Sequence, residues 1–277
     1  MGPLGLAALG LLLAACVPAL PARSSAPAPP TVAPASQASQ AAHEARPATS
    51  PSPTISVPIL MYHYIRVNPD PADHLGAGLS VTPDDFRSQM DWLAESGWHT
   101  VHLAQVHAYF ARGEPLPPRP IVLSFDDGYA DFYSTALPIL RAHGFSAVAY
   151  LVPGFLDTPG YLTRDQVRSL EGSGVEVGSH SLTHPDLTTV HGARLAQEVA
   201  DSGRQLTELV GHPVLDFCYP SGRWNQEVVD QVQAAGYLTA TTTQLGRERA
   251  WADRYAWGRI RVSGGEALRD FARALSV

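Results

Sequence analysis

Residues 120–128 read Pro-Ile-Val-Leu-Ser-Phe-Asp-Asp-Gly, and residues 175–185 read Val-Glu-Val-Gly-Ser-His-Ser-Leu-Thr-His-Pro. In each stretch a short apolar run is followed at once by side chains that can bind a metal ion or a proton. Such runs predict buried strands, so the polar residues lie at the carboxyl ends of those strands. In parallel α/β folds, functional side chains gather at that end. These two stretches therefore predict a functional site at the carboxyl ends of buried strands.

Around these stretches, β-branched runs alternate with amphipathic helical patterns from residue 54 onward. We expect strands at 57–62, 100–103, 121–125, 147–152, 175–179, 215–219, 238–242 and 259–262, and helices at 83–96, 130–143, 164–172, 194–210 and 226–235. Helix 83–96 is the clearest, because Thr82 can cap it and Pro83 suits its first position. Seven or eight strand–helix units predict a parallel sheet in an α/β protein. They favour a closed or nearly closed barrel over an open doubly wound sheet.

Composition limits the class of protein. The chain has 277 residues, of which 45% are apolar, enough for one good core. Its net charge is −7 and its 19 basic residues are scattered, so we expect no nucleic-acid partner. We expect a single catalytic domain over residues 54–277, acting as a monomer.

The first 53 residues predict export. Residues 1–15 form a short apolar run typical of a signal peptide, and Leu13-Ala14-Ala15-Cys16 resembles the bacterial lipobox, whose cysteine is lipidated. Residues 16–53 are dominated by Ala, Pro, Ser, Thr and Gln, which predicts a disordered tether. We therefore expect a protein exported and lipid-anchored to a bacterial cell envelope through Cys16. A plain secretory signal that contains a cysteine stays open, because Lys and Arg are absent from the leading residues.

Two acidic residues follow the strand at 121–125. Adjacent carboxylates are costly to ionise together without a cation, so one of Asp126 and Asp127 can bind a metal while the other acts as a base. Gly128 permits a sharp exit from the strand. Taken alone, Asp-Asp-Gly is more simply a turn.

Two histidines follow the strand at 175–179. His180 and His184 are separated by three residues, a spacing that lets both reach one ion. Single histidines are usually structural, but a pair at one strand end and an acidic pair at another favour a metal site. Asp127, His180 and His184 would form a two-histidine, one-carboxylate set. We expect Zn²⁺, with Co²⁺, Ni²⁺ and Fe²⁺ as alternatives.

Ser-Phe-Asp-Asp-Gly followed by His-Ser-Leu-Thr-His-Pro resembles the first two motifs of the polysaccharide deacetylase family, the NodB-homology domain or carbohydrate esterase family 4. The order and separation also match, and the resemblance covers most of residues 57–262. It implies a distorted (β/α) barrel of about seven parallel strands. It also implies metal ligation by Asp127, His180 and His184, with Asp126 as general base.

The third motif departs from the family pattern. Residues 217–222 read Phe-Cys-Tyr-Pro-Ser-Gly, with Cys218 where many members carry an arginine. This form is similar to the branch that deacetylates poly-β-1,6-N-acetylglucosamine. The resemblance assigns the backbone N–H of Ser221 to the oxyanion and places Tyr219 beside the substrate. Cys218 lies within an apolar strand, where a thiol is usually inert, so we do not expect a nucleophile.

The family's C-terminal Leu-x-His is absent, since no histidine follows His212. In the same branch a Met-Tyr-His segment resembles residues 61–63, and this implies His63 as general acid. A packing or capping role for His63 stays open. Residues 253–262 resemble the closing strand of that branch. There Arg259 is expected to hold Asp126 ionised and Trp257 to line the acetyl pocket, although ordinary barrel packing explains either residue equally well.

The resemblance implies a metal-dependent hydrolase that removes N-acetyl groups from N-acetylglucosamine units of an acetylated polysaccharide. An O-acetyl esterase would use the same residues. A glycan-binding barrel with impaired catalysis is a third alternative. The altered third motif and the absent final histidine favour this third interpretation, whereas the intact acidic and histidine pairs oppose it.

Overall fold

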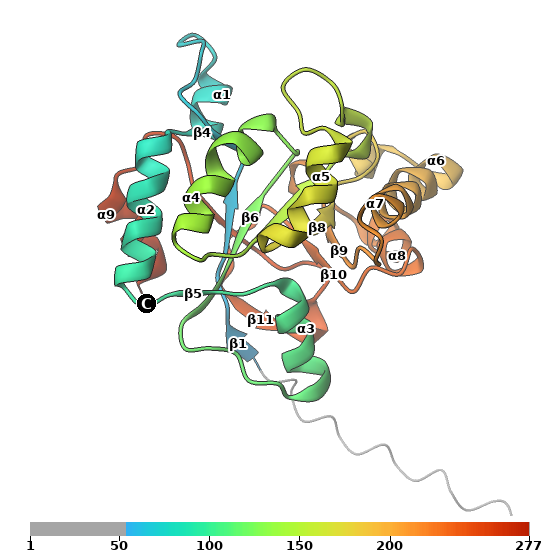
Figure 1. Cartoon of the computed structure of the whole chain (residues 1–277). Coiled ribbons are helices and arrows are strands. Elements are labelled where there is room, and N and C mark those ends of the chain that lie inside the picture. Colours follow the sequence, from blue (N-terminus) through green and yellow to red (C-terminus); the bar gives the residue numbers. More distant parts are fainter. Residues whose placement is uncertain (1–53, 277) are drawn as a thin grey trace, which may run out of the picture. The chain divides into compact units, whose positions relative to one another are not determined.

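The computed structural model describes residues 54–276. The expected signal peptide, the lipidation of Cys16 and the tether lie outside these residues. Within them, one parallel sheet has the strand order β10-β9-β8-β7-β6-β2-β12, and β5 pairs with the first half of β6. The expected barrel of about seven parallel strands is confirmed (Figure 1). In chain order these strands are β2 (Ile59–Tyr62), β5 (His99–Thr100), β6 (Pro120–Phe125), β7 (Ala147–Leu151), β8 (Val175–Ser179), β9 (Asp216–Cys218), β10 (Thr239–Thr241) and β12 (Ile260–Arg261).

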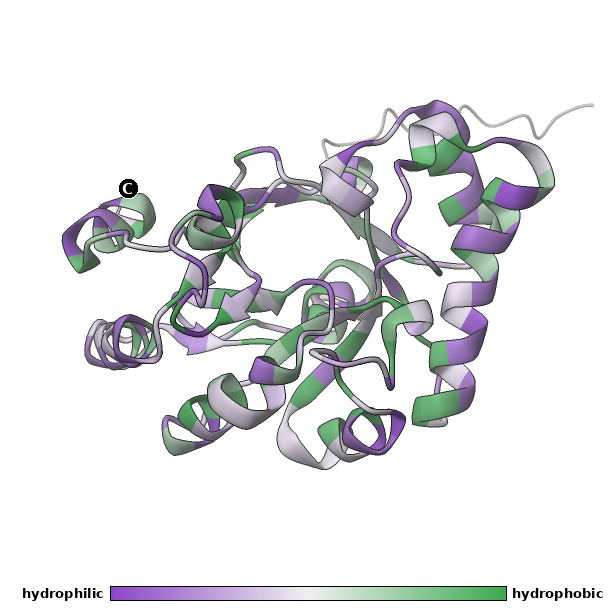
Figure 2. Ribbon diagram, turned by 90° about the horizontal axis from the view of Figure 1, so that it is seen from above, coloured by the Kyte–Doolittle hydropathy of each residue, from purple (hydrophilic) through white to green (hydrophobic). Residues whose placement is uncertain are grey.

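The segment at residues 257–262 closes the sheet into a ring. At one end Trp257 forms a parallel bridge with Thr241 of β10. At the other end β12 pairs with β2, with Ile260 opposite Leu60. The first and last strands of the sheet are therefore joined through one bent segment. Seen from above, the strands curve round and the helices lie outside them (Figure 2).

Helices follow most strands, and most of the helices lie outside the ring (Figure 2). They are α1 (His74–Leu79), α2 (Pro83–Glu95), α3 (Leu103–Arg112), α4 (Leu137–Ala142), α5 (Arg164–Leu170), α6 (Gly192–Ala196), α7 (Ser202–Val210), α8 (Gln226–Ala234) and α9 (Leu268–Leu275). Helix α2 begins as expected, because the Thr82 hydroxyl accepts the backbone N–H of Asp85 and Pro83 occupies the first turn. No helix among the described residues has the length and apolar character needed to cross a bilayer.

Short elements complete the domain. Strand β1 (Thr54–Ser56) pairs with β11 (Glu248–Ala250), and β3 (Tyr64–Ile65) pairs with β4 (Ser80–Val81). Five 3₁₀ turns connect the elements of residues 54–276: η2 (Pro153–Phe155), η3 (Glu171–Ser173), η4 (Leu187–Thr189), η6 (Pro220–Gly222) and η7 (Trp251–Asp253).

Several expected boundaries were wrong. The strand expected at 100–103 ends at Thr100, and Leu103 instead begins α3, which the sequence interpretation missed. The cause is a local cap, in which the Gln105 side chain accepts the backbone N–H of His102. The helices expected at 130–143 and 194–210 each contain a π-helical turn, η1 (Phe132–Ala136) and η5 (Gln197–Asp201). Helix α9 was also missed.

The core has two parts that follow the two-residue period of the strands. One cluster lies between strands and helices, and includes Leu60, Leu123 and Ile260. The other fills the inside of the ring, and includes Ile59, Val122 and Trp257. Neighbouring strand residues thus alternate between the two clusters, as successive side chains of a strand must. This alternation decides which side chains can face the inside of the barrel.

Candidate functional site

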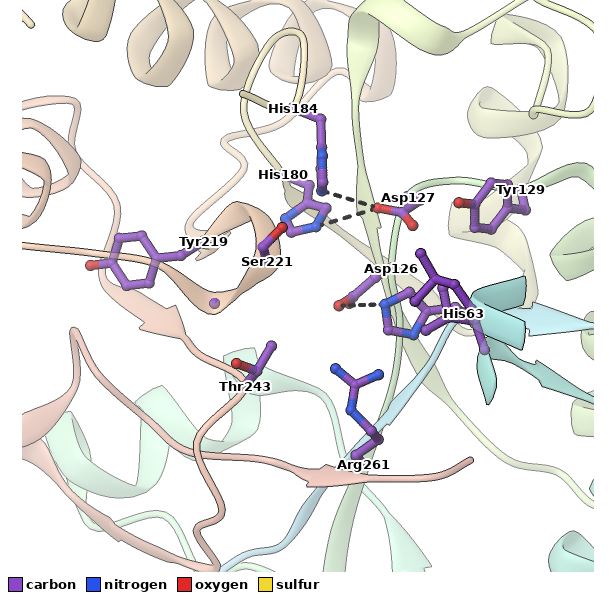
Figure 3. Close-up of a pocket in the computed structure, with 13 residues that line it drawn as sticks. His63, Asp126, Asp127, Tyr129, His180, His184, Tyr219, Ser221, Thr243 and Arg261 are labelled. Carbon is purple, nitrogen blue, oxygen red and sulfur yellow. Dashed lines mark ion pairs between the residues drawn. The ribbon is translucent and has the colours of Figure 1, made fainter. Parts of the chain in front are cut away.

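A cavity of about 340 Å³ opens at the carboxyl ends of the parallel strands. It contains all of the acidic and histidine residues that the sequence singled out, drawn in Figure 3. The lining residues are His63, Leu75, Leu79, Asp126, Asp127, Tyr129, His180, His184, Tyr219, Ser221, Gly222, Thr243 and Arg261. Segments far apart in the chain thus meet at one end of the barrel.

Asp127, His180 and His184 form a candidate metal site. Their ligand atoms all lie within 4.8 Å of one another. Oδ1 of Asp127 is 3.5 Å from Nε2 of His180 and 3.4 Å from Nε2 of His184. His180 Nδ1 lies 2.7 Å from the carbonyl oxygen of Cys218, so Nδ1–H donates there and the Nε2 lone pair faces the site. A histidine held by a carbonyl in this way is the usual arrangement at a metal, so the residues fit a bound ion.

The backbone is strained where it presents these side chains. Six non-glycine residues between 54 and 276 have φ in the left-handed region, and Asp127, His184 and Ser221 are three of them, with φ values of 73°, 59° and 55°. Such conformations cost free energy and persist only where the surrounding structure enforces them, commonly at functional sites. Gly128, at φ 80°, makes the expected sharp exit after the acidic pair.

The loop that carries the two histidines is braced from within the fold. The hydroxyl of Ser181 accepts the backbone N–H of His184 at 2.9 Å. The buried carboxylate of Glu198 accepts the backbone N–H of Thr183 at 2.9 Å and its hydroxyl at 2.6 Å. This role of Glu198 was not predicted from the sequence, because an acidic residue on a helix is normally solvated. Only its packing under the loop reveals the role.

Asp126 lies beneath the metal site and is bound by Arg259. The two ends of the guanidinium donate to the two carboxylate oxygens, each at 2.7 Å, and both side chains are buried. Burial raises the pKa of Asp126, but the charge and hydrogen bonds of Arg259 outweigh it and hold that pKa well below its usual range. Arg259 therefore lies against Asp126, and this ion pair favours the ionised form of the carboxyl at neutral pH.

Cys218 lies beside this ion pair. Its sulfur is 3.2 Å from Nη2 of Arg259 and 3.8 Å from Oδ2 of Asp126. The thiol is free and fully buried, packed inside the ring with Trp257 and Val148. Arg259, which directly precedes β12, donates to Asp126 on the same side as the Cys218 thiol.

His63 faces Asp126 across the cavity. Its Nε2 lies 3.9 Å from Oδ2 of Asp126, and its side chain is 13% exposed. Burial is the main cause that lowers the pKa of His63, with Arg259 and Arg261 adding to it, and the carboxylates of Asp126 and Asp127 only partly oppose this. His63 therefore reaches the reacting region. Whether it serves as the acid stays a prediction.

The three residues assigned to the oxyanion and substrate lie in different places. Ser221 lines the cavity. The ring of Tyr219 points away from the aspartates (Figure 3), and its hydroxyl donates to the carbonyl of Tyr255 at 2.9 Å. Trp257 is not among the lining residues. It is 1% exposed within the inner cluster, and its indole N–H donates to the carbonyl of Ala250, which favours barrel packing over a pocket wall.

Other lining residues were not expected. Tyr129, Thr243 and Arg261 add polar groups, and Leu75 and Leu79 of α1 add an apolar wall. Arg261 lies two residues after Arg259 in the sequence, the spacing that places two side chains of an extended segment on the same side. The approach of α1 depends on the fold, because no local pattern places a short helix over a distant strand end.

Known proteins resemble the chain in both sequence and fold. The family model described as Polysaccharide deacetylase matches residues 113–240. YxkH of Bacillus subtilis, itself only provisionally named a polysaccharide deacetylase, is 28% identical over 209 residues, which are 76% of this chain and 72% of that protein. The poly-β-1,6-N-acetyl-D-glucosamine N-deacetylase of Escherichia coli K12 is 36% identical over 119 residues, which are 37% of this chain and 18% of that enzyme.

Among solved structures, Streptococcus pyogenes deacetylase PplD in complex with acetate superposes with a TM-score of 0.75 at 26% identity. The match covers 82% of this chain and all of that one. The likeness therefore extends over the whole barrel and is not confined to the motifs.

Proposed function

This chain belongs to the polysaccharide deacetylase family, and we propose that it removes N-acetyl groups from N-acetylglucosamine units of an extracellular or cell-wall polysaccharide. One observation carries the proposal. The metal-ligating set of Asp127, His180 and His184 shares a cavity with a buried, ionised carboxylate on Asp126. Hydrolysis of an amide needs a base beside an activated water, and this arrangement supplies both positions.

Asp127, His180 and His184 would hold a divalent cation, for which Zn²⁺ is our choice because two imidazoles and a carboxylate suit it. When bound, the ion polarises the acetamide carbonyl and lowers the pKa of a water molecule. The remaining steps belong to the side chains around it.

Asp126 accepts a proton from the attacking water, and Arg259 keeps its carboxylate ionised and oriented. The backbone N–H of Ser221 stabilises the oxyanion that develops on the carbonyl oxygen of the acetyl group. His63 protonates the departing amine. Water and the acetamide are thereby converted into acetate and a free amine, and the polymer gains a cationic glucosamine unit at neutral pH.

The cellular setting is part of the proposal. The apolar leader and the lipobox-like residues 13–16 support export and a lipid anchor at Cys16, which would hold a monomeric catalytic domain at the cell envelope. The partial match to the E. coli enzyme and the Tyr-Pro-x-Gly form of the third motif support a substrate of the poly-β-1,6-linked type, with a role in biofilm.

The test is acetate release from N-acetylglucosamine oligosaccharides by protein that has been stripped of metal and reloaded with one cation at a time. We expect activity to disappear on chelation and to return with Zn²⁺, Co²⁺ or another divalent ion. Asp126→Asn should reduce turnover by roughly 10²-fold or more, because it removes the base.

Asp165→Asn is the matched control, since this exposed aspartate lies on α5 and pairs only with Arg168. Full activity after complete chelation, or equal rates for Asp126→Asn and wild type, would contradict the mechanism. Acetate release from O-acetylated glycans but not from N-acetylated ones would identify an esterase.

A further inference from the structure

Residues 259–262, which include strand β12, present two arginines on the same side. Because successive strand side chains alternate, Arg259 and Arg261 point to one side while Ile260 and Val262 pack into the outer core cluster. Arg259 is buried and binds Asp126. Arg261, two residues further toward the carboxyl end, is exposed and lines the cavity. Figure 3 shows its guanidinium directed toward His63 and Asp126.

Arg261 has no partner of its own. No ion pair or side-chain hydrogen bond joins it to any other residue within 54–276, whereas Arg223, on another loop at this end of the barrel, pairs with Asp186 at 2.7 Å. Among residues 54–276, the carboxylates that line the cavity belong to Asp126 and Asp127. The first is bound by Arg259, and the second faces the two histidines. The guanidinium of Arg261 is thus available to a molecule that enters the cavity.

The charges around the cavity leave an excess of positive charge. Asp126 and Asp127 contribute −2, Arg259 and Arg261 contribute +2, and a divalent ion on the three ligands would add +2, so the sum is +2. Such a cavity attracts anions and repels cations. A neutral N-acetylated sugar would gain nothing from this excess, but an anionic one would.

We propose that Arg261 binds an anionic group, a carboxylate or a phosphate, carried on or next to the N-acetylated sugar that enters the site. The inference rests on the proposed function and narrows it, because it requires the N-acetylated polymer to carry anionic groups, which an unsubstituted poly-β-1,6-linked N-acetylglucosamine chain lacks. A guanidinium suits this task, since its paired N–H groups match the two oxygens of a carboxylate or phosphate. The same excess charge favours release of the cationic amine after hydrolysis.

The test compares three acetylated oligosaccharides of equal length with metal-loaded protein. One is neutral and built from N-acetylglucosamine, one carries carboxylates as N-acetylmuramic acid units, and one carries a 6-phosphate. For wild type we expect an anionic substrate to have the higher kcat/KM. Arg261→Gln should lower kcat/KM for that substrate by roughly 5- to 20-fold, mainly through KM. It should lower kcat/KM less for the neutral substrate, so that the preference for the anionic substrate disappears.

Two variants serve as controls. Arg261→Lys keeps the charge without the paired donors and should restore part of the preference. Arg269→Gln removes an equal charge from the exposed start of α9 and should change nothing. A wild type that does not prefer either anionic substrate would overturn the proposal. An Arg261→Gln variant that loses activity equally on all three substrates would overturn it as well.

Binding of the same oligosaccharides, measured by calorimetry, separates this inference from the proposed function. Selective binding of the anionic oligosaccharides that depends on Arg261, without acetate release from any substrate, would support anion binding by Arg261 and contradict the proposed hydrolase activity. Acetate release, together with equal affinity for neutral and anionic oligosaccharides, would support the proposed hydrolase activity and contradict anion binding by Arg261.

Discussion

Arg259 and Asp126 lie 133 residues apart in the chain and form a buried two-point ion pair. Burial alone would raise the pKa of the carboxyl and favour its neutral form, which cannot accept a proton. Arg259 reverses this, so under the proposed mechanism its effect on the reaction passes through Asp126. Arg259 is thus a positioning residue, and its contribution can be separated from that of Asp126.

Arg259→Gln should leave Asp126 buried without its countercharge. We expect the free energy of unfolding to fall by about 3–5 kcal/mol, as for other broken buried pairs. The pKa of Asp126 should rise, so the acid limb of the pH–rate profile should move to higher pH. Chemical unfolding and kcat/KM as a function of pH measure the two effects. A profile that keeps its wild-type acid limb would show that Arg259 does not control the base.

Cys218→Ser should retain activity. The thiol neighbours Arg259 and Asp126 but is fully buried, and the smaller hydroxyl of serine can accept from the same guanidinium. We expect turnover within about threefold of wild type and no inactivation of wild type by thiol-alkylating reagents, since a buried thiol does not react. Loss of turnover by more than roughly 10²-fold would instead make the sulfur part of the chemistry.

At the level of elements, α3 and two strands hold a buried titrating cluster at the amino ends of the strands, opposite the site. His107 of α3 lies 3.0 Å from Asp216 of β9, without the alignment of a hydrogen bond. Glu176 of β8 accepts the first backbone N–H groups of α3, from Leu103 and Ala104. Burial and the nearby Asp216 raise the pKa of Glu176 to about 7. Burial lowers the pKa of His107, but the negative charge of Asp216 outweighs burial, so the pKa of His107 lies above its usual value.

Both pKa values are higher in the folded protein than in the unfolded chain, so the folded state binds more protons near neutral pH. Stability from this cluster is therefore present at pH 5 and is lost as the pH rises through about 7. In Glu176→Gln, the change in the free energy of unfolding between pH 5 and pH 8 should be smaller than in wild type by on the order of 2–3 kcal/mol. Urea unfolding of variant and wild type at each pH measures this difference in unfolding free energy. The other titrating groups are the same in both proteins, so their contributions cancel in the comparison.

Glu208→Gln provides the control for this prediction, because Glu208 is exposed on α7 and pairs only with Arg204. Its unfolding free energy should follow the wild-type pH dependence. Parallel curves for Glu176→Gln and wild type would show that this cluster does not bind the extra protons.

At the scale of the molecule, the closure of the barrel decides whether the site exists. The closing segment brings Arg259 and Arg261 to the cavity, and Gly258 lets it pass close to residues 244–246. A side chain at Gly258 would place its Cβ 2.7 Å from the carbonyl oxygen of Gln244 and 2.9 Å from the backbone nitrogen of Gly246. Both contacts are with backbone, so the segment would have to move.

Gly258→Ala should therefore destabilise the protein by about 1–3 kcal/mol and also reduce turnover, because Arg259 follows directly. Gly172→Ala, at a glycine whose added Cβ meets nothing within 4 Å, is the matched control and should change neither property. Thermal unfolding and acetate release together measure the outcome. Normal turnover in Gly258→Ala would mean that the ion pair tolerates movement of the closing segment.

The strand–helix alternation, the parallel barrel and the groups of residues that carry chemistry could be predicted from the sequence. They depend on periodicity and on motifs that are local in the chain. Asp126, Asp127, His180 and His184 each follow an apolar strand, and such ends must meet at one edge of a parallel sheet. The ends of the elements were less predictable, since α3 begins where a side-chain cap interrupts the expected strand.

Only the tertiary structure decided which distant side chains complete the site. In the folded protein Arg259 binds Asp126, and Cys218 lies beside this pair. Glu198 binds the loop that carries the two histidines, and Trp257 packs in the inner core cluster. The physical reason is that these contacts depend on the bend of the closing segment and on long-range packing. Neither leaves a periodic signal in the sequence.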